Sequence, residues 1–409
     1  MGLDVSVTER LNRRLGTGDA VVIGLGSMIG AGVFVAFAPA ARAAGSALLI
    51  GLALAALVAY CNATSSARLA ARYPSSGGTY VYGKERLGEF WGYLAGWGFV
   101  VGKTASCAAM ALTVAAYLVP AGWRPYVAAA VVLALTALNY RGVHKSALVT
   151  RVIVAVTLLV LVAAVVAIFL SGNGSGHEVF AFSFGGVLQS AGLLFFAFAG
   201  YARIATLGEE VRDPARTIPR AIPIALGLTL VVYIAVAFAL LYKLGADGLA
   251  SFVDPIARAV PSGMAPVVRA GAAVAALGAL LALVLGVSRT TFAMARDGHL
   301  PRRLAAVHPR FGVPHRAEVA VGVVVAVLVL FTDLRGAIGF SSFAVLTYYA
   351  IANASAWTLR RGVVPAAGLI GCVVLAFSLP LWSVVIGCAV LAVGAIAYFS
   401  RRANTSSQD

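Results

Sequence analysis

The sequence predicts an all-α membrane protein with about twelve transmembrane helices. Of its 409 residues, 61% are hydrophobic and only 11% are charged, whereas soluble domains contain about 45–50% apolar and about 25% charged residues. A water-soluble core cannot bury so much apolar surface. Uncharged runs such as 152–170 also have roughly the 20 residues that a helix needs to cross about 30 Å of hydrocarbon.

The expected transmembrane helices are apolar segments bounded by charges, proline or glycine. A hydrophilic stretch, 245–263, separates the seventh from the eighth and is expected to hold short helices at the membrane surface. No segment remains for a soluble domain. The twelve segments are 18–40, 45–70, 88–119, 125–139, 147–170, 187–211, 218–243, 266–295, 317–332, 336–358, 363–379 and 381–399.

The basic residues predict how the chain is oriented. A net charge of +16 would suggest nucleic acid as the partner of a soluble chain, but here the charges are spread over short loops, so no nucleic acid is expected. Of the 31 Lys and Arg residues, 24 fall on one side of the predicted membrane, six fall on the other, and Lys103 lies inside a span. The positive-inside rule places both termini in the cytoplasm, in a lipid bilayer of the bacterial inner (plasma) membrane type.

Several other function classes are not supported by the residues. The four cysteines lie in apolar runs without metal-type spacing, and the five histidines lie outside the apolar cores, so neither a metal nor a cofactor is expected. No nucleophile–base pair or zinc motif occurs at membrane depth, which argues against an enzyme. No charged ring repeats as in a channel. The first span lacks a cleavage site and is expected to stay in the protein.

The first span contains an unusual number of glycines between Gly24 and Phe34, and each of them costs a helix interior up to about 1 kcal/mol relative to alanine. One interpretation is close helix packing through Gly26 and Gly30. Another is a local unwinding whose freed backbone groups line a cavity. A nucleotide-binding loop is disfavoured, because no strand precedes the glycines and the spacing matches neither common phosphate motif.

A second interruption, Phe195 to Tyr201, falls in the sixth span. Paired interruptions in two halves of a chain are typical of transporters with a site at the membrane midplane. Helix N-termini there suit a substrate carboxylate, and loosened carbonyls suit an ammonium group, so a zwitterionic amino acid fits. The candidate substrate-binding residues are Ser27, Met28, Ile29, Gly30, Ala31, Gly32, Phe196, Ala197, Phe198, Ala199, Gly200 and Tyr201.

Several motifs occur in one order along the chain: GSMIGAGVF in the first span, YPSSGGTYVY before the third, FFAFAGY and GEEVRDPARTIPRAI around the end of the sixth, and SRTTFAMARDGHLP after the eighth. Together they resemble the permeases of the amino acid–polyamine–organocation (APC) family. The resemblance implies alternating access, amino-acid-type substrates and a LeuT-like core of five-plus-five inverted repeats in which helices 1 and 6 are interrupted.

The resemblance also divides the chain. It implies a transport core over 18–358, with a first repeat over 18–170 and a second over 187–358. Two additional helices follow over 363–399. The cytoplasmic tails are then 1–17 and 400–409.

The sequence departs from the family in its charged and polar positions. Thr157 stands where many members carry a lysine, and 267–287 of the eighth span contains no oxygen-bearing side chain, so a sodium site is poorly supported. Lys103 lies deep in the third span, where a lysine costs about 2.5–3.5 kcal/mol. It is either a proton carrier or anion contact, or an amine paired structurally with backbone carbonyls.

Further differences concern the inner mouth. Ala202 stands where relatives often have an acidic residue, which disfavours a cationic substrate. Arg203, Glu209 and Glu210 are gate candidates, or ordinary solvated charges near the membrane edge. The expected function is a sodium-independent secondary transporter of amino acids with a neutral preference, acting as an antiporter or a proton symporter. The alternatives are a cationic amino acid or polyamine exchanger and a non-transporting sensor.

Overall fold

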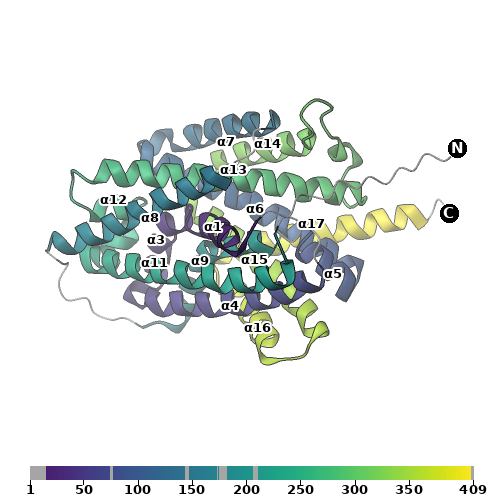
Figure 1. Ribbon diagram of the computed structural model, residues 1–409, viewed down its shortest axis with the longest axis horizontal. Helices are drawn as coiled ribbons and strands as arrows, with labels where there is room; N and C mark the ends of the chain where they lie inside the picture. The colour runs from purple at the N-terminus through teal and green to yellow at the C-terminus, as the bar shows by residue number, and fades with distance from the viewer. Residues whose placement is uncertain are drawn as a thin grey trace.

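The computed structural model describes residues 15–73, 77–142, 147–172, 174, 182–205 and 211–406. Within these residues every regular element is a helix, apart from one isolated bridge between Leu15 and Val211. Most of the long helices run along the long axis of the molecule (Figure 1). The all-α class predicted from composition is confirmed.

Each of the twelve predicted segments coincides with a helix or with a helix that is broken. The first segment comprises three pieces, and the sixth comprises two helices joined by a 3-10 turn. The elements are α1 (Thr17–Met28), α2 (Gly32–Val35), α3 (Phe37–Ala44), α4 (Leu48–Arg72), α5 (Thr79–Leu87), α6 (Glu89–Leu118), α7 (Arg124–Tyr140), α8 (Ala147–Leu170), α9 (Phe184–Phe198), η3 (Ala199–Tyr201), α10 (Ala202–Ala205), α11 (Pro214–Ser251), α12 (Pro255–Ala259), α13 (Ala265–Arg296), η4 (Arg302–Ala305), α14 (His315–Phe331), α15 (Leu334–Leu359), α16 (Val363–Phe377) and α17 (Leu381–Ser406).

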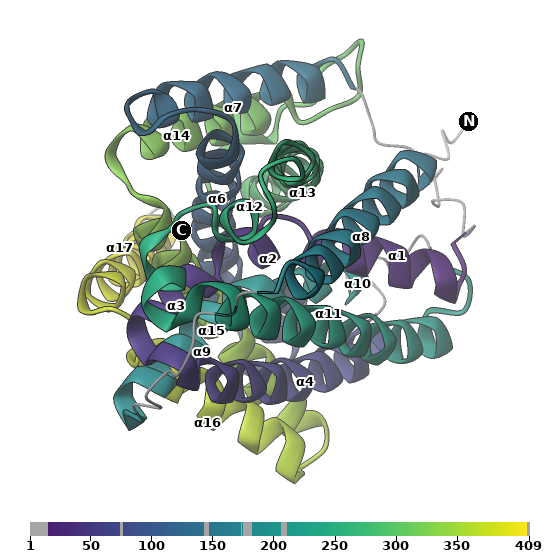
Figure 2. The ribbon, with the colours of Figure 1, turned by 90° about the vertical axis from the view of Figure 1, so that its left-hand side faces the viewer.

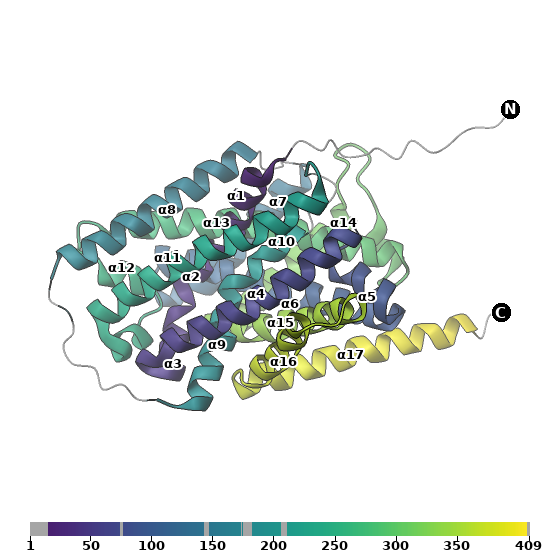
Figure 3. The same cartoon turned by 60° about the horizontal axis from the view of Figure 1, so that its bottom comes forward.

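Ten helical stretches within the described residues are long and apolar enough to cross a membrane. The other two predicted spans correspond to α14 and α16, which have only 17 and 15 residues. At 1.5 Å per residue these helices reach about 25 Å and about 23 Å, which a bilayer accommodates by local thinning. Both lie at the periphery, α14 beside α7 and α16 at the opposite edge (Figure 2). Along that edge α16 packs against α15 and α4 (Figure 3).

The hydrophilic stretch between the seventh and eighth spans holds a short helix, α12, as predicted. Pro255 and Ile256 of this helix are buried against the protein. Asp254, directly before α12, is also buried, and its carboxylate pairs with Arg258 at 3.3 Å and with Arg269 of α13 at 3.2 Å. In Figure 1, α12 covers the end of the bundle opposite α5.

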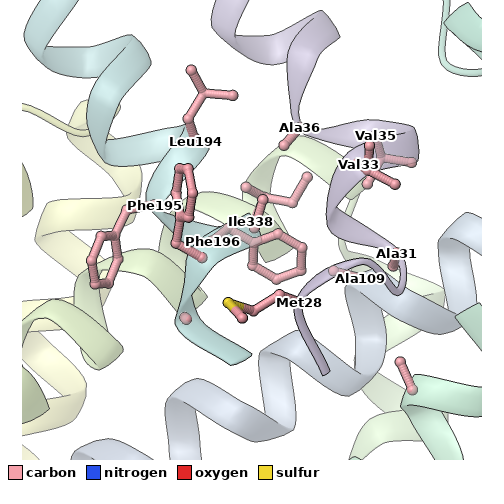
Figure 4. Close-up of a cluster of buried hydrophobic side chains, with 14 of the residues drawn as sticks. Met28, Ala31, Val33, Val35, Ala36, Ala109, Leu194, Phe195, Phe196 and Ile338 are labelled. Carbon is pink, nitrogen blue, oxygen red and sulfur yellow. The ribbon is translucent and has the colours of Figure 1, made fainter. Parts of the chain in front are cut away.

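The centre of the bundle is formed around the broken first and sixth spans. Met28 and Phe196 come from these two spans and belong to one buried cluster with Ala109 of α6 and Ile338 of α15 (Figure 4). Small residues on α6 and α13 allow the surrounding helices to approach closely. The fold therefore places two helix breaks against one another, far from both ends of the bundle.

Candidate functional site

Both predicted interruptions are present, and their backbones are in direct contact. Residues 29–31 are non-helical, and η3 interrupts the sixth span. A β-carbon at Gly200 would collide with the backbone of Ser27 and lie 2.7 Å from the amide nitrogen of Met28, and one at Gly32 would lie 2.7 Å from the Cα atom of Ala197. Both contacts are closer than real β-carbons make. Glycine at positions 32 and 200 therefore lets the two breaks meet, and the unwinding interpretation is confirmed.

Buried side chains bind several of the carbonyls that the breaks release. The hydroxyl group of Tyr233 on α11 lies 2.7 Å from the carbonyl oxygen of Met28 and 2.9 Å from that of Ala197, so it joins the two breaks. The amine of Lys103 donates to the carbonyl of Ala199 at 3.2 Å. Such bonds matter because an unsatisfied buried carbonyl costs about 1–3 kcal/mol. They fix the breaks in one conformation.

A cavity of about 280 Å³ lies beside the two breaks. It runs from the centre of the bundle to α5 and the last turns of α13. Its walls come from both breaks, from one face of α6, from one face of α13 and from the start of α5. The lining residues are Ser27, Met28, Gly32, Gly77, Tyr80, Phe99, Lys103, Ser106, Met110, Phe196, Ala197, Ala199, Gly200, Arg203, Ala279, Ala282, Leu283, Gly286, Arg289, Thr290 and Ala293.

The structure brings together seven of the twelve predicted substrate-binding residues and both basic candidates. Those seven, with Lys103 and Arg203, line the cavity. Glu209 and Glu210 lie outside the described residues. The seven are Ser27, Met28, Gly32, Phe196, Ala197, Ala199 and Gly200.

The other five predicted residues are buried behind the wall. Gly30 faces α13, where a β-carbon would lie 2.6 Å from that of Ala279. The ring of Phe198 packs edge-on against Tyr233, with centroids 5.0 Å apart. Tyr201 stacks on Tyr349 at the same centroid distance of 5.0 Å. Ile29 and Ala31 are likewise buried in the core.

The wall formed by α13 was not predicted. Its lining residues recur every three or four positions, from Ala279 through Gly286 to Ala293, so they form one face of the helix. They are mostly small and apolar, and composition alone does not distinguish such a face from ordinary packing. The spacing of small residues toward Arg289 was the available signal.

The described lining carries three basic side chains, Lys103, Arg203 and Arg289, and includes no acidic one. The described part of the chain also contains no cluster of three potential His, Cys, Asp or Glu metal ligands. Hydroxyl groups near the cavity bind carbonyls of their own helices, for example Thr290 to Gly286 at 3.2 Å. The polar character of the cavity is therefore cationic.

A small polar cluster lies at the α5 end of the cavity. The phenol of Tyr80 donates to Asp297 at 2.6 Å and lies 2.8 Å from Nδ1 of His299. Because a phenol has one proton, the ring nitrogen must be the donor in the second bond. Burial raises the pKa of Tyr80, and the hydrogen bond to Asp297 raises it further. Burial lowers the pKa of His299, despite the opposing charge of Asp297.

This cluster predicts a pH-dependent stability. Since the pKa of His299 is lowered in the folded protein, the unfolded chain binds more protons below about pH 6.5, and stability falls as the pH falls through that window. His299→Gln should remove this contribution, about 1–3 °C in thermal midpoint. The measurement is a series of melting curves between pH 5 and pH 8 for both proteins. Identical pH dependence in the two would contradict the prediction.

The comparisons with known proteins agree with the geometry. The model of the family described as amino acid permease matches residues 15–407. An uncharacterised transporter of Mycobacterium tuberculosis is 66% identical, with 97% of this chain and 93% of that protein aligned. The branched-chain amino acid permease BcaP of Bacillus subtilis is 26% identical over 96% of this chain and 93% of its own. Cationic amino acid transporter 4 of Homo sapiens is 30% identical over 87% of this chain and 61% of its own.

A family match across nearly the whole described chain, together with many apolar helices, establishes the class of the protein. All three relatives are named as transporters, and two of them as transporters of amino acids. The chain belongs to the amino acid permease family, within the APC transporters, and is a multi-pass membrane transporter.

Proposed function

We propose that this permease is a sodium-independent secondary transporter of neutral amino acids that works by alternating access. The substrate occupies the cavity of about 280 Å³ between the breaks. The main support for the proposal is the lining of this cavity, in which backbone from two broken helices lies beside basic side chains. Freed N–H groups and cations favour a carboxylate, as helix N-termini generally do.

The preference for a neutral side chain rests on charge. A cationic substrate would need a buried carboxylate to compensate its second positive charge, and the described lining supplies Lys103, Arg203 and Arg289 instead. Among the relatives, one is named for branched-chain and one for cationic amino acids. The cationic lining favours the first of these substrate classes.

The direction in which the cavity faces follows from the basic loops. If most Lys and Arg residues are cytoplasmic, both termini lie in the cytoplasm and the α5 end is the inner end. The cavity extends toward that end, with Tyr80 and Arg289 in its wall, while α12 covers the other. We therefore propose that this conformation is inward-facing and that Arg203, in the cavity wall, belongs to the inner gate.

Transport by the purified protein in liposomes tests the proposal. Labelled alanine and leucine should exchange with internal substrate, and replacing sodium by choline should leave the rate unchanged within about twofold. A tenfold change in affinity corresponds to about 1.4 kcal/mol, and arginine and lysine should compete at least tenfold more weakly than leucine. Preferred binding of arginine or a polyamine would overturn the neutral assignment, and a sodium requirement would overturn the ion assignment.

A further inference from the structure

A second hollow, separate from the substrate cavity, lies on the membrane-facing side of the bundle. It is a groove of about 520 Å³ between α4 and α11, which pack against each other (Figure 2). Every residue that lines it is apolar except Tyr60, whose side chain carries one hydroxyl group. Leu57 and Phe238 in its walls are more than half exposed. In a bilayer, a groove of this kind is open to lipid chains.

The groove is long enough to hold an extended acyl chain. A hydrogen bond of 2.6 Å from Arg42, just before α4, to the last turn of α11 places the start of one helix beside the end of the other. The helices are therefore antiparallel, and Tyr60 and Pro223 mark one end of the groove while Leu49 and Phe238 mark the opposite end. These limits give about 17 Å along α4 and about 22 Å along α11, whereas one leaflet contributes about 15 Å of hydrocarbon.

Small residues keep the middle of the groove open. Ala53 and Ala56 line it from α4, and Gly227 lines it from α11. A β-carbon added at Gly227 would meet no atom within 4 Å. The space is therefore left by the absence of side chains, and a larger residue at position 227 would enter it.

Two arginines continue the faces of the groove beyond its Tyr60 end. Arg68 follows Leu57 by 11 residues, about three helical turns, and Arg220 precedes Gly227 by seven residues, about two turns, so each lies on the groove side of its helix. Both are exposed. Neither forms a hydrogen bond or an ion pair with another described residue. These two guanidinium groups can therefore bind an anion from the membrane.

The other charges on these helices are less suited to this role. Arg216 pairs with Asp213 at 3.6 Å. At the opposite end of the groove, Arg42 is held by its bond to α11, and Lys243 donates to the carbonyl of Gly172 at 3.0 Å. That end also carries an exposed acidic residue, Asp247. Positive charge that can bind a ligand is thus concentrated at the Tyr60 end, which the positive-inside rule assigns to the cytoplasm.

We propose that the groove is a binding site for a phospholipid with an anionic headgroup. One acyl chain lies along α4 and α11, and Arg68 and Arg220 bind the phosphate, for which guanidinium groups have suitable geometry. The apolar walls alone would not select a lipid, because all lipid chains are similarly apolar. Basic residues near the membrane surface attract anionic lipids, so the arginines supply the selectivity. This site does not depend on the proposed substrate.

Native mass spectrometry of delipidated protein in detergent tests the role of the arginines. The probes are phosphatidylglycerol and phosphatidylcholine with identical acyl chains. The wild type should retain the first bound phosphatidylglycerol at least about fivefold better than phosphatidylcholine. The double variant Arg68→Gln with Arg220→Gln should reduce that preference to within about twofold. Arg302→Gln with Arg303→Gln is the matched control, since both residues are exposed arginines on η4, away from the groove, and should keep the wild-type preference.

A second variant tests the groove without changing charge. Gly227→Leu fills the space assigned to the acyl chain and should lower retention of both lipids at least about threefold. Gly185→Leu on α9 is its control, because a β-carbon there also meets no atom within 4 Å but Gly185 lies outside the groove. Melting curves establish that each variant is folded.

Three outcomes would overturn the proposal. Equal retention of the two lipids by the wild type would identify the groove as ordinary lipid-facing surface. An unchanged preference in the double arginine variant would remove the headgroup site, and unchanged retention in folded Gly227→Leu would remove the acyl-chain site. None of these measurements uses transport, so a failure of the proposed substrate or coupling leaves this inference unaffected.

Discussion

Replacing Gly286 with leucine is expected to weaken substrate binding strongly while leaving the protein folded. Gly286 lies in the cavity wall on α13, and a β-carbon added there meets no atom within 4 Å. The new side chain would therefore extend into the space assigned to the substrate. Forcing extra methylenes into an occupied site costs about 1–3 kcal/mol, so affinity should fall about 10- to 100-fold. Binding of labelled leucine to purified protein and its melting temperature are the measurements.

A control substitution at a second glycine distinguishes loss of space in the cavity from damage to a helix. Gly227 of α11 also has no atom within 4 Å of an added β-carbon, but it lies in an apolar groove between α4 and α11, away from the breaks. Gly227→Leu should bind and transport substrate as the wild type does. If Gly286→Leu retained wild-type affinity, the cavity would not be the substrate site.

A substitution at Gly200 is a less specific test of the substrate site, although the sequence predicts that Gly200 binds substrate. Any side chain there meets the backbone of Ser27, which cannot move aside as a flexible side chain can. Gly200→Val should therefore lower the melting temperature together with transport. Loss of activity in that variant alone would not distinguish a damaged break from a blocked substrate site.

The two breaks were predictable because their cause is local. Clustered glycines and the FFAFAGY motif weaken a helix whatever surrounds it, and the structure interrupts both spans there. Which residues around a break face the substrate is not determined by the local sequence. Ile29 and Ala31 lie within the predicted stretch but are directed into the core, since packing against other helices decides the direction.

The positions of Arg289 and Glu318 could not be predicted for the same reason. Along the chain, Arg289 belongs to a run of basic residues after an apolar span, and such residues are usually solvated charges. Glu318 stands at the start of another span, where an acidic residue is favourable for the helix dipole. Only the packing of α13 and α14 places one in the cavity wall and buries the other.

For Lys103, too, the sequence does not tell whether the residue has a function in transport or only a structural one. The residue lies midway along α6, is 6% exposed, and its amine both lines the cavity and donates to Ala199. A hydrogen bond to a charged group contributes about 1.5–3 kcal/mol, which at most offsets the roughly 2.5–3.5 kcal/mol cost of a lysine at membrane depth. Stability alone therefore gives no reason to keep an amine here. We propose that Lys103 carries the coupling or charge-compensating role that a fifth-helix lysine would otherwise have, since Thr157 occupies that position and binds its own helix at Ile153.

Lys103→Met, which keeps an unbranched side chain of similar length and removes its charge, should abolish accumulation of substrate driven by an imposed proton gradient. Exchange at equal pH should persist at about a tenth of the wild-type rate or more, because the breaks are still joined by Tyr233. Lys243→Met is the control, since Lys243 likewise donates to a carbonyl, that of Gly172 at 3.0 Å, but is not part of the cavity wall. It should accumulate substrate normally. Unchanged accumulation and pH dependence in Lys103→Met, or a sodium requirement in the wild type, would leave the amine only its structural role, which is to hold the carbonyl of Ala199 in the break.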